Sequence, residues 1–172
     1  MSGRMVLRTL AIVALTLLVQ VTVILDVRVD GASPEIMFLL PIAAGIAAGP
    51  VEGAAVGFVA GLAADLLTAT PLGISALVGT LVGFGVGAVS GGVVREVRGL
   101  PTLVALSASA VAVMLYAVLG AVLGESQFLH VDLGVVVAVI SVTNAVLAGP
   151  AVRIMRWALA APAERSPARG RP

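Results

Sequence analysis

Long apolar runs, with charged residues confined to their ends, constrain this chain more than any other feature of its sequence. Only 11% of the 172 residues are charged, against about 25% in a typical soluble domain. A helix rises about 1.5 Å per residue, so about 20 apolar residues cross the roughly 30 Å hydrocarbon core of a bilayer. The runs predict an all-α integral membrane protein, a six-transmembrane-helix bundle. The predicted spans are 6–25, 34–49, 51–69, 73–94, 102–123 and 133–158.

The first apolar run is interpreted as a retained helix, and the last dozen residues as a tail. The run is longer than the core of a secretory signal peptide, and no small-residue cleavage motif follows it at 26–33. Residues 161–172 are rich in Pro, Ala and Arg, a composition typical of disorder. We therefore expect a six-helix transmembrane domain over residues 1–160 and a disordered cytoplasmic tail over 161–172.

The positions of the arginines predict the orientation. With six spans both termini lie on one side of the membrane, and of the ten basic residues only Arg28 falls on the other side. Arginine and lysine are enriched on the cytoplasmic side of membrane proteins. Both termini are therefore expected in the cytoplasm. The arginines on that side are Arg4, Arg8, Arg95, Arg98, Arg153, Arg156, Arg165, Arg169 and Arg171.

The second predicted span differs from the others because it is short and carries Pro41 in its interior. Proline inside a helix removes a hydrogen bond and bends the helix. We expect this span to be kinked, or packed away from lipid by its neighbours. Only Gly49-Pro50 separates it from the third span. Such a short link predicts that the second and third spans form a close antiparallel hairpin.

Glycines recur at every fourth position in two places. Positions four apart lie on one face of a helix, so each series makes a surface without side chains. In lipid, helices associate through close backbone contact at such surfaces. The series therefore predict tight packing within the bundle, or alternatively an open groove that accepts a helix from a partner protein. The first series is Gly45, Gly49, Gly53, Gly57 and Gly61, and the second is Gly79, Gly83, Gly87 and Gly91.

Asp65 lies on the same helix face as Gly57 and Gly61. A carboxylate within a span is costly unless it is bonded. We expect Asp65 to lie toward the outer surface and either to cap a nearby helix end or to bond to exposed backbone, with the turn at residues 70–73 as one target. Proton or ion coupling is a less favoured alternative, because no Lys, Arg or His partner is apparent within the spans.

The sequence argues against an enzyme. It contains no cysteine, no lysine and a single histidine, His130, in a predicted outer loop. Thiolate chemistry, a phosphate-binding loop with its lysine and a His-Glu-x-x-His metal motif are therefore excluded. Gly73-Ile74-Ser75 resembles the G-x-S of intramembrane serine proteases, but catalysis would need His130 on a helix facing Ser75. No cofactor is expected.

Binding of nucleic acid and conduction of ions are also disfavoured. The formal net charge of +1 gives no basic field that would attract nucleic acid. An ion pathway needs a polar stripe through several spans. The candidates are few and spread over three spans, and hydroxyl side chains commonly bond to their own helix. They are Gln20, Ser107, Ser109, Ser141, Thr143 and Asn144.

Residues 34–87 carry a pattern that resembles the MreD family of rod shape-determining proteins. Pro34-Glu35 opens the second span, and the third reads Gly53-x3-Gly57-Phe58-x2-Gly61-Leu62-x2-Asp65-Leu66-Leu67. Pro71-Leu72-Gly73 follows, and then the glycine-rich fourth span. The total length, the six predicted spans and the cytoplasmic termini also agree with that family. The remaining spans agree only in being hydrophobic.

This resemblance implies a non-catalytic scaffold of the cell-elongation complex in the bacterial inner (plasma) membrane. Such proteins bind the single-span protein MreC and link MreB filaments, directly or indirectly, to the peptidoglycan synthases RodA and its class B penicillin-binding protein, which maintains cell shape. Besides these partners, membrane lipid is expected to contact the chain. The positions singled out for a structural or interface role are Gly53, Gly57, Gly61, Asp65, Pro71, Gly73, Gly79, Gly83 and Gly87.

A substrate-binding S component of an energy-coupling-factor vitamin transporter is the alternative, because MreD resembles these six-helix proteins in overall fold. S components hold a vitamin with aromatic and polar groups in their outer loops, and bind the transport module through Ala-x-x-x-Ala motifs. The outer loops here offer only Gln127, Phe128, His130 and a few carboxylates. Ala11 and Ala14 are three residues apart rather than four. These features favour the scaffold.

Overall fold

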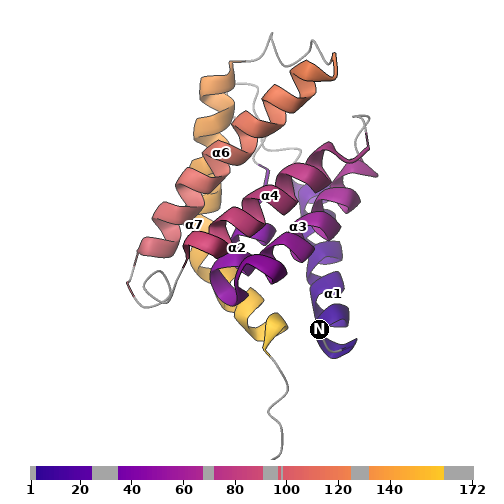
Figure 1. Ribbon diagram of the computed structural model, residues 1–172, viewed down its shortest axis with the longest axis vertical. Coiled ribbons are helices and arrows are strands. Elements are labelled where there is room, and N and C mark those ends of the chain that lie inside the picture. The colour runs from indigo at the N-terminus through magenta and orange to yellow at the C-terminus, as the bar shows by residue number, and fades with distance from the viewer. Residues whose placement is uncertain are drawn as a thin grey trace, which may run out of the picture.

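The computed structural model describes residues 3–24, 35–67, 72–90, 97, 99–124 and 132–160. Within these ranges the chain forms six α-helices and no strand (Figure 1), as the all-α prediction requires. In the part of the chain that the structure describes, three segments are long and apolar enough to cross a bilayer: Gly3–Thr22, Leu100–Val122 and Leu133–Leu159. The helices are α1 (Gly3–Val19), which continues as a π-helix (Gln20–Ile24), α2 (Leu39–Ala48), α3 (Pro50–Asp65), α4 (Ile74–Val89), α6 (Leu100–Val122) and α7 (Leu133–Leu159).

The second, third and fourth predicted spans each contain a helix, but that helix is shorter than predicted. Helix α2 has 10 residues, and α3 and α4 have 16 each. At about 1.5 Å per residue, α2 is about 15 Å long, half the thickness of a hydrocarbon core. The prediction of one continuous helix over 34–49 is therefore wrong. Apolarity alone does not distinguish a residue in a helix from one in the turn that precedes it.

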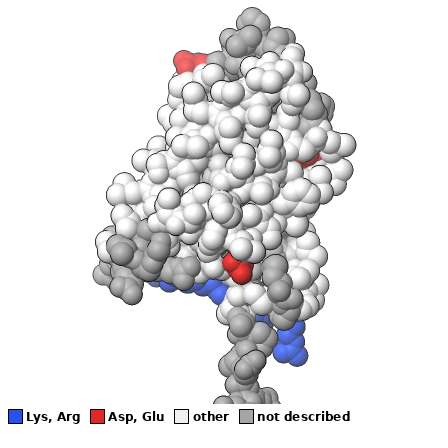
Figure 2. Space-filling model, viewed as in Figure 1, with Lys and Arg blue, Asp and Glu red and all other residues white. Residues whose placement is uncertain are grey.

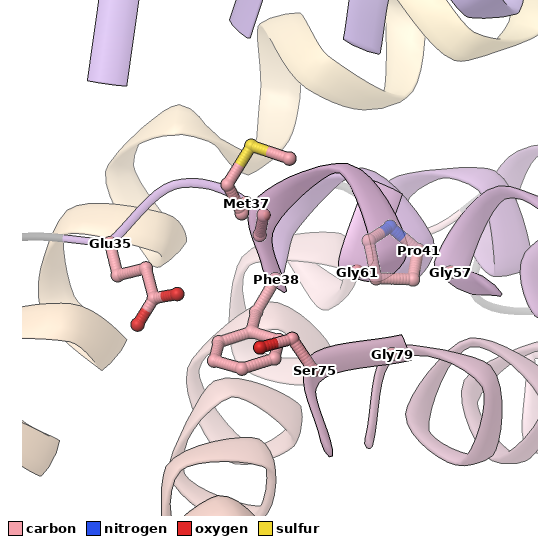
Figure 3. Close-up of a pocket in the computed structure, with 9 residues that line it drawn as sticks. Glu35, Met37, Phe38, Pro41, Gly57, Gly61, Ser75 and Gly79 are labelled. Carbon is pink, nitrogen blue, oxygen red and sulfur yellow. The ribbon is translucent and has the colours of Figure 1, made fainter. Parts of the chain in front are cut away.

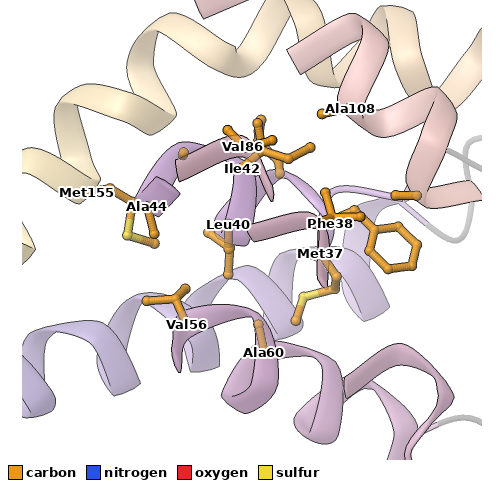
Figure 4. Packing of buried hydrophobic residues seen from close by; sticks show 14 of the residues in the cluster. Met37, Phe38, Leu40, Ile42, Ala44, Val56, Ala60, Val86, Ala108 and Met155 are labelled. Atoms are coloured by element: carbon orange, nitrogen blue, oxygen red, sulfur yellow. The ribbon is translucent and has the colours of Figure 1, made fainter. Parts of the chain in front are cut away.

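Helix α2 lies in the middle of the molecule, where α3, α4 and α7 surround it (Figure 4). Every residue from Leu39 to Ile46 is buried, and the side chains of Ile42 and Ile46 are completely inaccessible. The expectation that this segment is packed away from lipid is confirmed. No kink is needed at Pro41, because α2 begins at Leu39 and the proline lies in its first turn. Backbone N–H groups in the first turn have no acceptor within the helix, so a proline at this position removes no helical hydrogen bond.

The link between α2 and α3 is a close hairpin, as predicted. Gly49 has a φ of 111°, a conformation that side chains disfavour, and its N–H donates to the carbonyl oxygen of Gly45 at 3.0 Å. Pro50 then begins α3, a position where its missing N–H costs no hydrogen bond. The two helices fold back closely: a β-carbon added at Gly53 would lie 2.9 Å from the Cα of Gly45.

Helices α6 and α7 form a second pair (Figure 1). Asn144 on α7 is fully buried, and its side-chain amide donates to the hydroxyl of Ser109 on α6 at 3.0 Å. At the start of α7, the carboxylate of Asp132 accepts hydrogen bonds from the N–H groups of Gly134 and Val135 at 3.0 and 3.4 Å. This is the side-chain cap typical of a helix N-terminus.

We expect Asp132→Ala to lower the free energy of unfolding by about 1 kcal/mol, because it removes the cap of α7. Asp132→Asn is expected to stay close to the parent, since its amide oxygen still accepts from the first turn. Unfolding of the purified proteins by a denaturing detergent, followed by circular dichroism, measures both values. Equal losses in the two variants would show that the charge of Asp132 matters and not its hydrogen bonds.

The first and last helices meet at one end of the molecule. The guanidinium of Arg8 donates to the carbonyl oxygen of Trp157 at 3.3 Å and lies 4.5 Å from the centroid of the indole ring. All arginines in the described ranges are in the first turns of α1 or the last turns of α7: Arg4, Arg8, Arg153 and Arg156. Figure 2 shows arginine side chains gathered at this end, near the N-terminus marked in Figure 1.

Candidate functional site: a glycine seam with a carboxylate cap

Helices α3 and α4 pack along their glycines. Gly53 faces Gly83, and Gly57 faces Gly79. Gly61 faces the backbone of Ser75 in the same way. Each step of four residues forward along α3 is matched by a step of four back along α4, so the helices are antiparallel and in register. We call this interface the glycine seam: Gly53, Gly57 and Gly61 on α3 with Gly79, Gly83 and Gly87 on α4.

The two backbones approach so closely that no side chain fits between them. A β-carbon added at Gly79 would lie 2.6 Å from the carbonyl oxygen of Gly57. One added at Gly57 would lie 2.8 Å from the amide nitrogen of Thr80. Both distances are shorter than real β-carbons show, and the atoms they meet belong to backbone that cannot turn aside. Glycine is therefore required at these positions by space rather than by backbone conformation.

The seam also includes α2. A β-carbon added at Gly45 would lie 2.7 Å from the carbonyl oxygen of Gly83. Gly87, one turn further along α4, packs against Gly49 and Pro50 in the α2–α3 hairpin. Three helices thus meet at Gly45, Gly53 and Gly83, and backbone-to-backbone contact holds them together.

Both glycine series are occupied from within the chain. Of the two interpretations of the series, internal packing describes the helical members that the structure covers. Gly49 lies in the hairpin turn, where its φ of 111° requires glycine, and Gly91 lies outside the described residues. An open groove along either series is not found there. A partner helix would therefore have to contact other faces of α3 or α4, or other helices.

Asp65, the last residue of α3, caps the N-terminus of α4. Its carboxylate accepts hydrogen bonds from the backbone N–H groups of Gly73 at 2.8 Å, Ser75 at 3.1 Å and Ala76 at 3.2 Å. The side chain is 1% exposed. Unpaired N–H groups and the positive end of the helix dipole favour a carboxylate at this place. The predicted capping of a nearby helix end is confirmed.

Gly73 makes the cap possible. Its φ of 106° is in the left-handed region, which lets the chain turn so that three N–H groups point to one carboxylate.

Pro71, another predicted site residue, lies outside the described residues. Ser75, which sequence analysis paired with His130, is buried, and its backbone N–H bonds to Asp65. His130 also lies outside the described ranges.

The seam encloses too little space for a substrate. A cavity of about 10 Å³ lies between α2, α3 and α4, lined by Phe38, Pro41 and Ser75 among others, with Glu35 at one side (Figure 3). Such a volume holds about one water molecule. Among the described residues, no three His, Cys, Asp or Glu side chains are grouped closely enough to hold a metal ion. The close contacts and hydrogen bonds of this region serve packing and capping.

Four of the six polar side chains considered for an ion pathway take part in hydrogen bonds that tie backbone or helices together. The side-chain oxygen of Gln20 accepts from the N–H of Ile36 at 3.0 Å. Ser107 donates to the carbonyl oxygen of Leu103 in its own helix at 3.0 Å, as expected for a hydroxyl in a membrane helix. Asn144 bonds to Ser109, as described above.

The described residues form a largely apolar cleft that the sequence did not single out. Gly85 lies between the seam glycines in sequence, but a β-carbon added there would meet no atom within 4 Å. It lines a cleft of about 430 Å³ between α4 and α6. We call this the α4–α6 cleft; it is lined by Leu81, Gly85 and Val89 on α4 and by Val104, Ser107 and Val111 on α6. The sequence indicates this surface only through the position of Gly85, which does not follow the four-residue spacing of the seam glycines.

The family model described as rod shape-determining protein MreD matches residues 2–158 of the chain. No curated protein and no solved structure matches. The similarity to S components of energy-coupling-factor transporters therefore stays a prediction.

Proposed function

Because the chain belongs to the MreD family of rod shape-determining proteins, we propose that it is a non-catalytic membrane scaffold of the bacterial rod complex. The single observation that carries this proposal is the family match, which covers residues 2–158 of 172. The family is a structural one that determines cell shape, and membership suggests association with the shape-determining complex. A closely packed seam without a substrate-sized cavity suits a scaffold.

In this proposal the chain crosses the bacterial plasma membrane six times and keeps both termini in the cytoplasm. The contact between Arg8 and Trp157 supports an even number of crossings, because it joins the start of α1 to the end of α7. The arginines at this end support its cytoplasmic placement. The shorter helices α2, α3 and α4 would be accommodated by burial against one another and against α7.

The proposed partners are MreC, the synthase RodA with its class B penicillin-binding protein, and MreB filaments, contacted directly or through the others. The glycine seam supports this role by holding α2, α3 and α4 as one rigid unit. We propose the α4–α6 cleft as the place where the single transmembrane helix of MreC docks. Gly85 and Ser107 give the cleft the small residues that close helix packing in lipid uses.

Gly85→Leu is expected to reduce the MreC recovered with the tagged protein by about ten-fold. A new side chain at a helix interface costs about 1–3 kcal/mol, and each 1.4 kcal/mol is a factor of ten in affinity. The fold should be unaffected, because Gly85 faces open space. The measurement is purification from native membranes in mild detergent, followed by quantitative mass spectrometry of the retained proteins.

Gly149→Leu is the matched control. Gly149, on α7, also faces open space, but it does not line the α4–α6 cleft. It should retain MreC at the level of the parent. Equal recovery of MreC by both variants would exclude the cleft as its docking site. Recovery of transporter ATPases and their membrane coupling subunit, in place of MreC and the synthases, would overturn the scaffold and favour the S-component alternative.

A further inference from the structure

An apolar groove separates α1 from α7. Its volume is about 200 Å³, and its walls are Ile12 and Thr16 on α1 and Leu147, Ala151 and Ile154 on α7, with Leu40 from α2 at its floor. Helix α1 makes few other contacts within the described chain, and its outward side chains Leu7, Leu10, Leu15 and Leu18 are exposed. The groove is therefore open along the side of the molecule.

A cationic side chain on α1 lies one helical turn beyond the residues that line this groove. Arg8 is one helical turn before Ile12 and two before Thr16, so these three residues follow one face of α1 over about 12 Å. On the opposite wall, Ile154 is followed by Trp157, whose ring lies 4.5 Å from the Arg8 guanidinium. Arginine and tryptophan are both typical of the level of lipid headgroups.

The charge of Arg8 has no carboxylate partner in the described part of the chain. The carbonyl oxygen of Trp157 accepts from one of the five N–H donors of its guanidinium, and the central guanidinium carbon lies over the indole ring. Arg4, Arg153 and Arg156 are at the same helix ends. The described carboxylate closest to this end in the proposed topology is Glu52, in the first turn of α3.

We propose that this groove binds one anionic phospholipid, with its headgroup phosphate on Arg8 and an acyl chain along Ile12, Ala151 and Ile154. Guanidinium groups form strong, directional hydrogen bonds with phosphate oxygens. The positive charge of Arg8 favours an anionic headgroup over a zwitterionic one. Beyond Arg8, the groove offers an apolar surface on which the acyl chain of such a lipid can lie. The lipid would fill the space between α1 and the remainder of the bundle.

Trp157 provides a direct measurement, because it is the only tryptophan of the chain and it contacts Arg8. The full protein is reconstituted in phosphatidylcholine vesicles that contain a brominated lipid, which quenches tryptophan fluorescence on contact. Brominated phosphatidylglycerol is compared with brominated phosphatidylcholine at equal mole fractions. We expect phosphatidylglycerol to occupy the site about five-fold more strongly, the preference that one arginine near an anionic headgroup provides.

Arg8→Gln is expected to abolish this preference. Arg153→Gln is the matched control: it removes the same charge from α7, whereas Arg8 is the arginine that contacts Trp157 and precedes the groove residue Ile12 by one turn. It should keep at least half of the preference. Ala151→Leu is expected to weaken quenching by phosphatidylglycerol while Arg8 stays in place, because it fills the groove.

Equal quenching of the unmodified protein by the two brominated lipids would overturn the proposal without any variant being needed. Equal loss of preference in Arg8→Gln and Arg153→Gln would also overturn it, because it would show a diffuse electrostatic effect. If Arg8→Gln kept the preference for phosphatidylglycerol, the proposal would likewise be overturned. Loss in Arg8→Gln and Ala151→Leu, with the preference kept in Arg153→Gln, would establish the site.

Discussion

Gly57→Ala is expected to lower the free energy of unfolding by about 3 kcal/mol, the upper end of the range for overpacking a well-packed interior. Gly57 lies in the middle of the glycine seam, and the added methyl group would meet the carbonyl group of Gly79 and the amide nitrogen of Thr80. These atoms belong to the backbone of α4, so relief requires the two helices to separate. Gly57→Leu is expected to prevent the α3–α4 pair from forming.

The measurement is unfolding in a denaturing detergent, with size-exclusion chromatography in mild detergent to detect misfolded protein. Gly85→Ala is the matched control, because Gly85 is on α4, the helix that packs against α3, but faces open space. It should be as stable as the parent or slightly more stable, since alanine favours the helix over glycine by about 1 kcal/mol. If Gly57→Ala were as stable as Gly85→Ala, the close packing of the seam would be disproved.

Asp65→Ala is expected to cost about 3 kcal/mol or more, because it leaves the N–H groups of Gly73, Ser75 and Ala76 without their acceptor. A buried donor without a partner costs about 1–3 kcal/mol. The start of α4 should be affected first, since these are the N–H groups of its first turn and of the residue before it. Faster hydrogen exchange at residues 73–76, measured by mass spectrometry, is the specific readout.

Asp65→Asn is expected to be intermediate, at about 1–2 kcal/mol. One carboxylate oxygen accepts from both Gly73 and Ala76, and the asparagine carbonyl can take its place. The amide nitrogen then takes the position of the other oxygen and faces the N–H of Ser75, where two donors oppose each other. Wild-type stability in both variants would show that Asp65 does not hold the start of α4.

The glycine pattern predicted the faces that pack, but not what they pack against. Spacing of four residues places Gly53, Gly57 and Gly61 on one side of a helix whatever lies opposite. That the opposing surface is α4, in antiparallel register, depends on the turn between the helices and on the lengths of both. The same spacing would be found on a helix that binds a partner protein, so the sequence alone could not choose between the two.

Asp65 was a case in which local sequence carried more information. A carboxylate at the end of an apolar helix, followed after a few residues by Pro71 and Gly73, has few possible partners other than the backbone of the following turn. Its role as a cap was therefore predictable. The three N–H groups that it binds were not, because they depend on the left-handed conformation of Gly73. Glu35 and Gly85 were not singled out as site residues because neither shares the spacing of the glycine series.

The sequence by itself determined the solvent and the class of fold. Apolar runs of about 20 residues with charges at their ends are typical of helices in lipid, where each backbone group bonds within its own segment. It also determined which surfaces lack side chains. Only the tertiary structure decided that α2 is a short helix enclosed by the others, that α4 fills the face of α3, and that α1 leaves a groove against α7. These outcomes depend on contacts between residues far apart in the chain, and close packing of whole helices selects them rather than any local pattern.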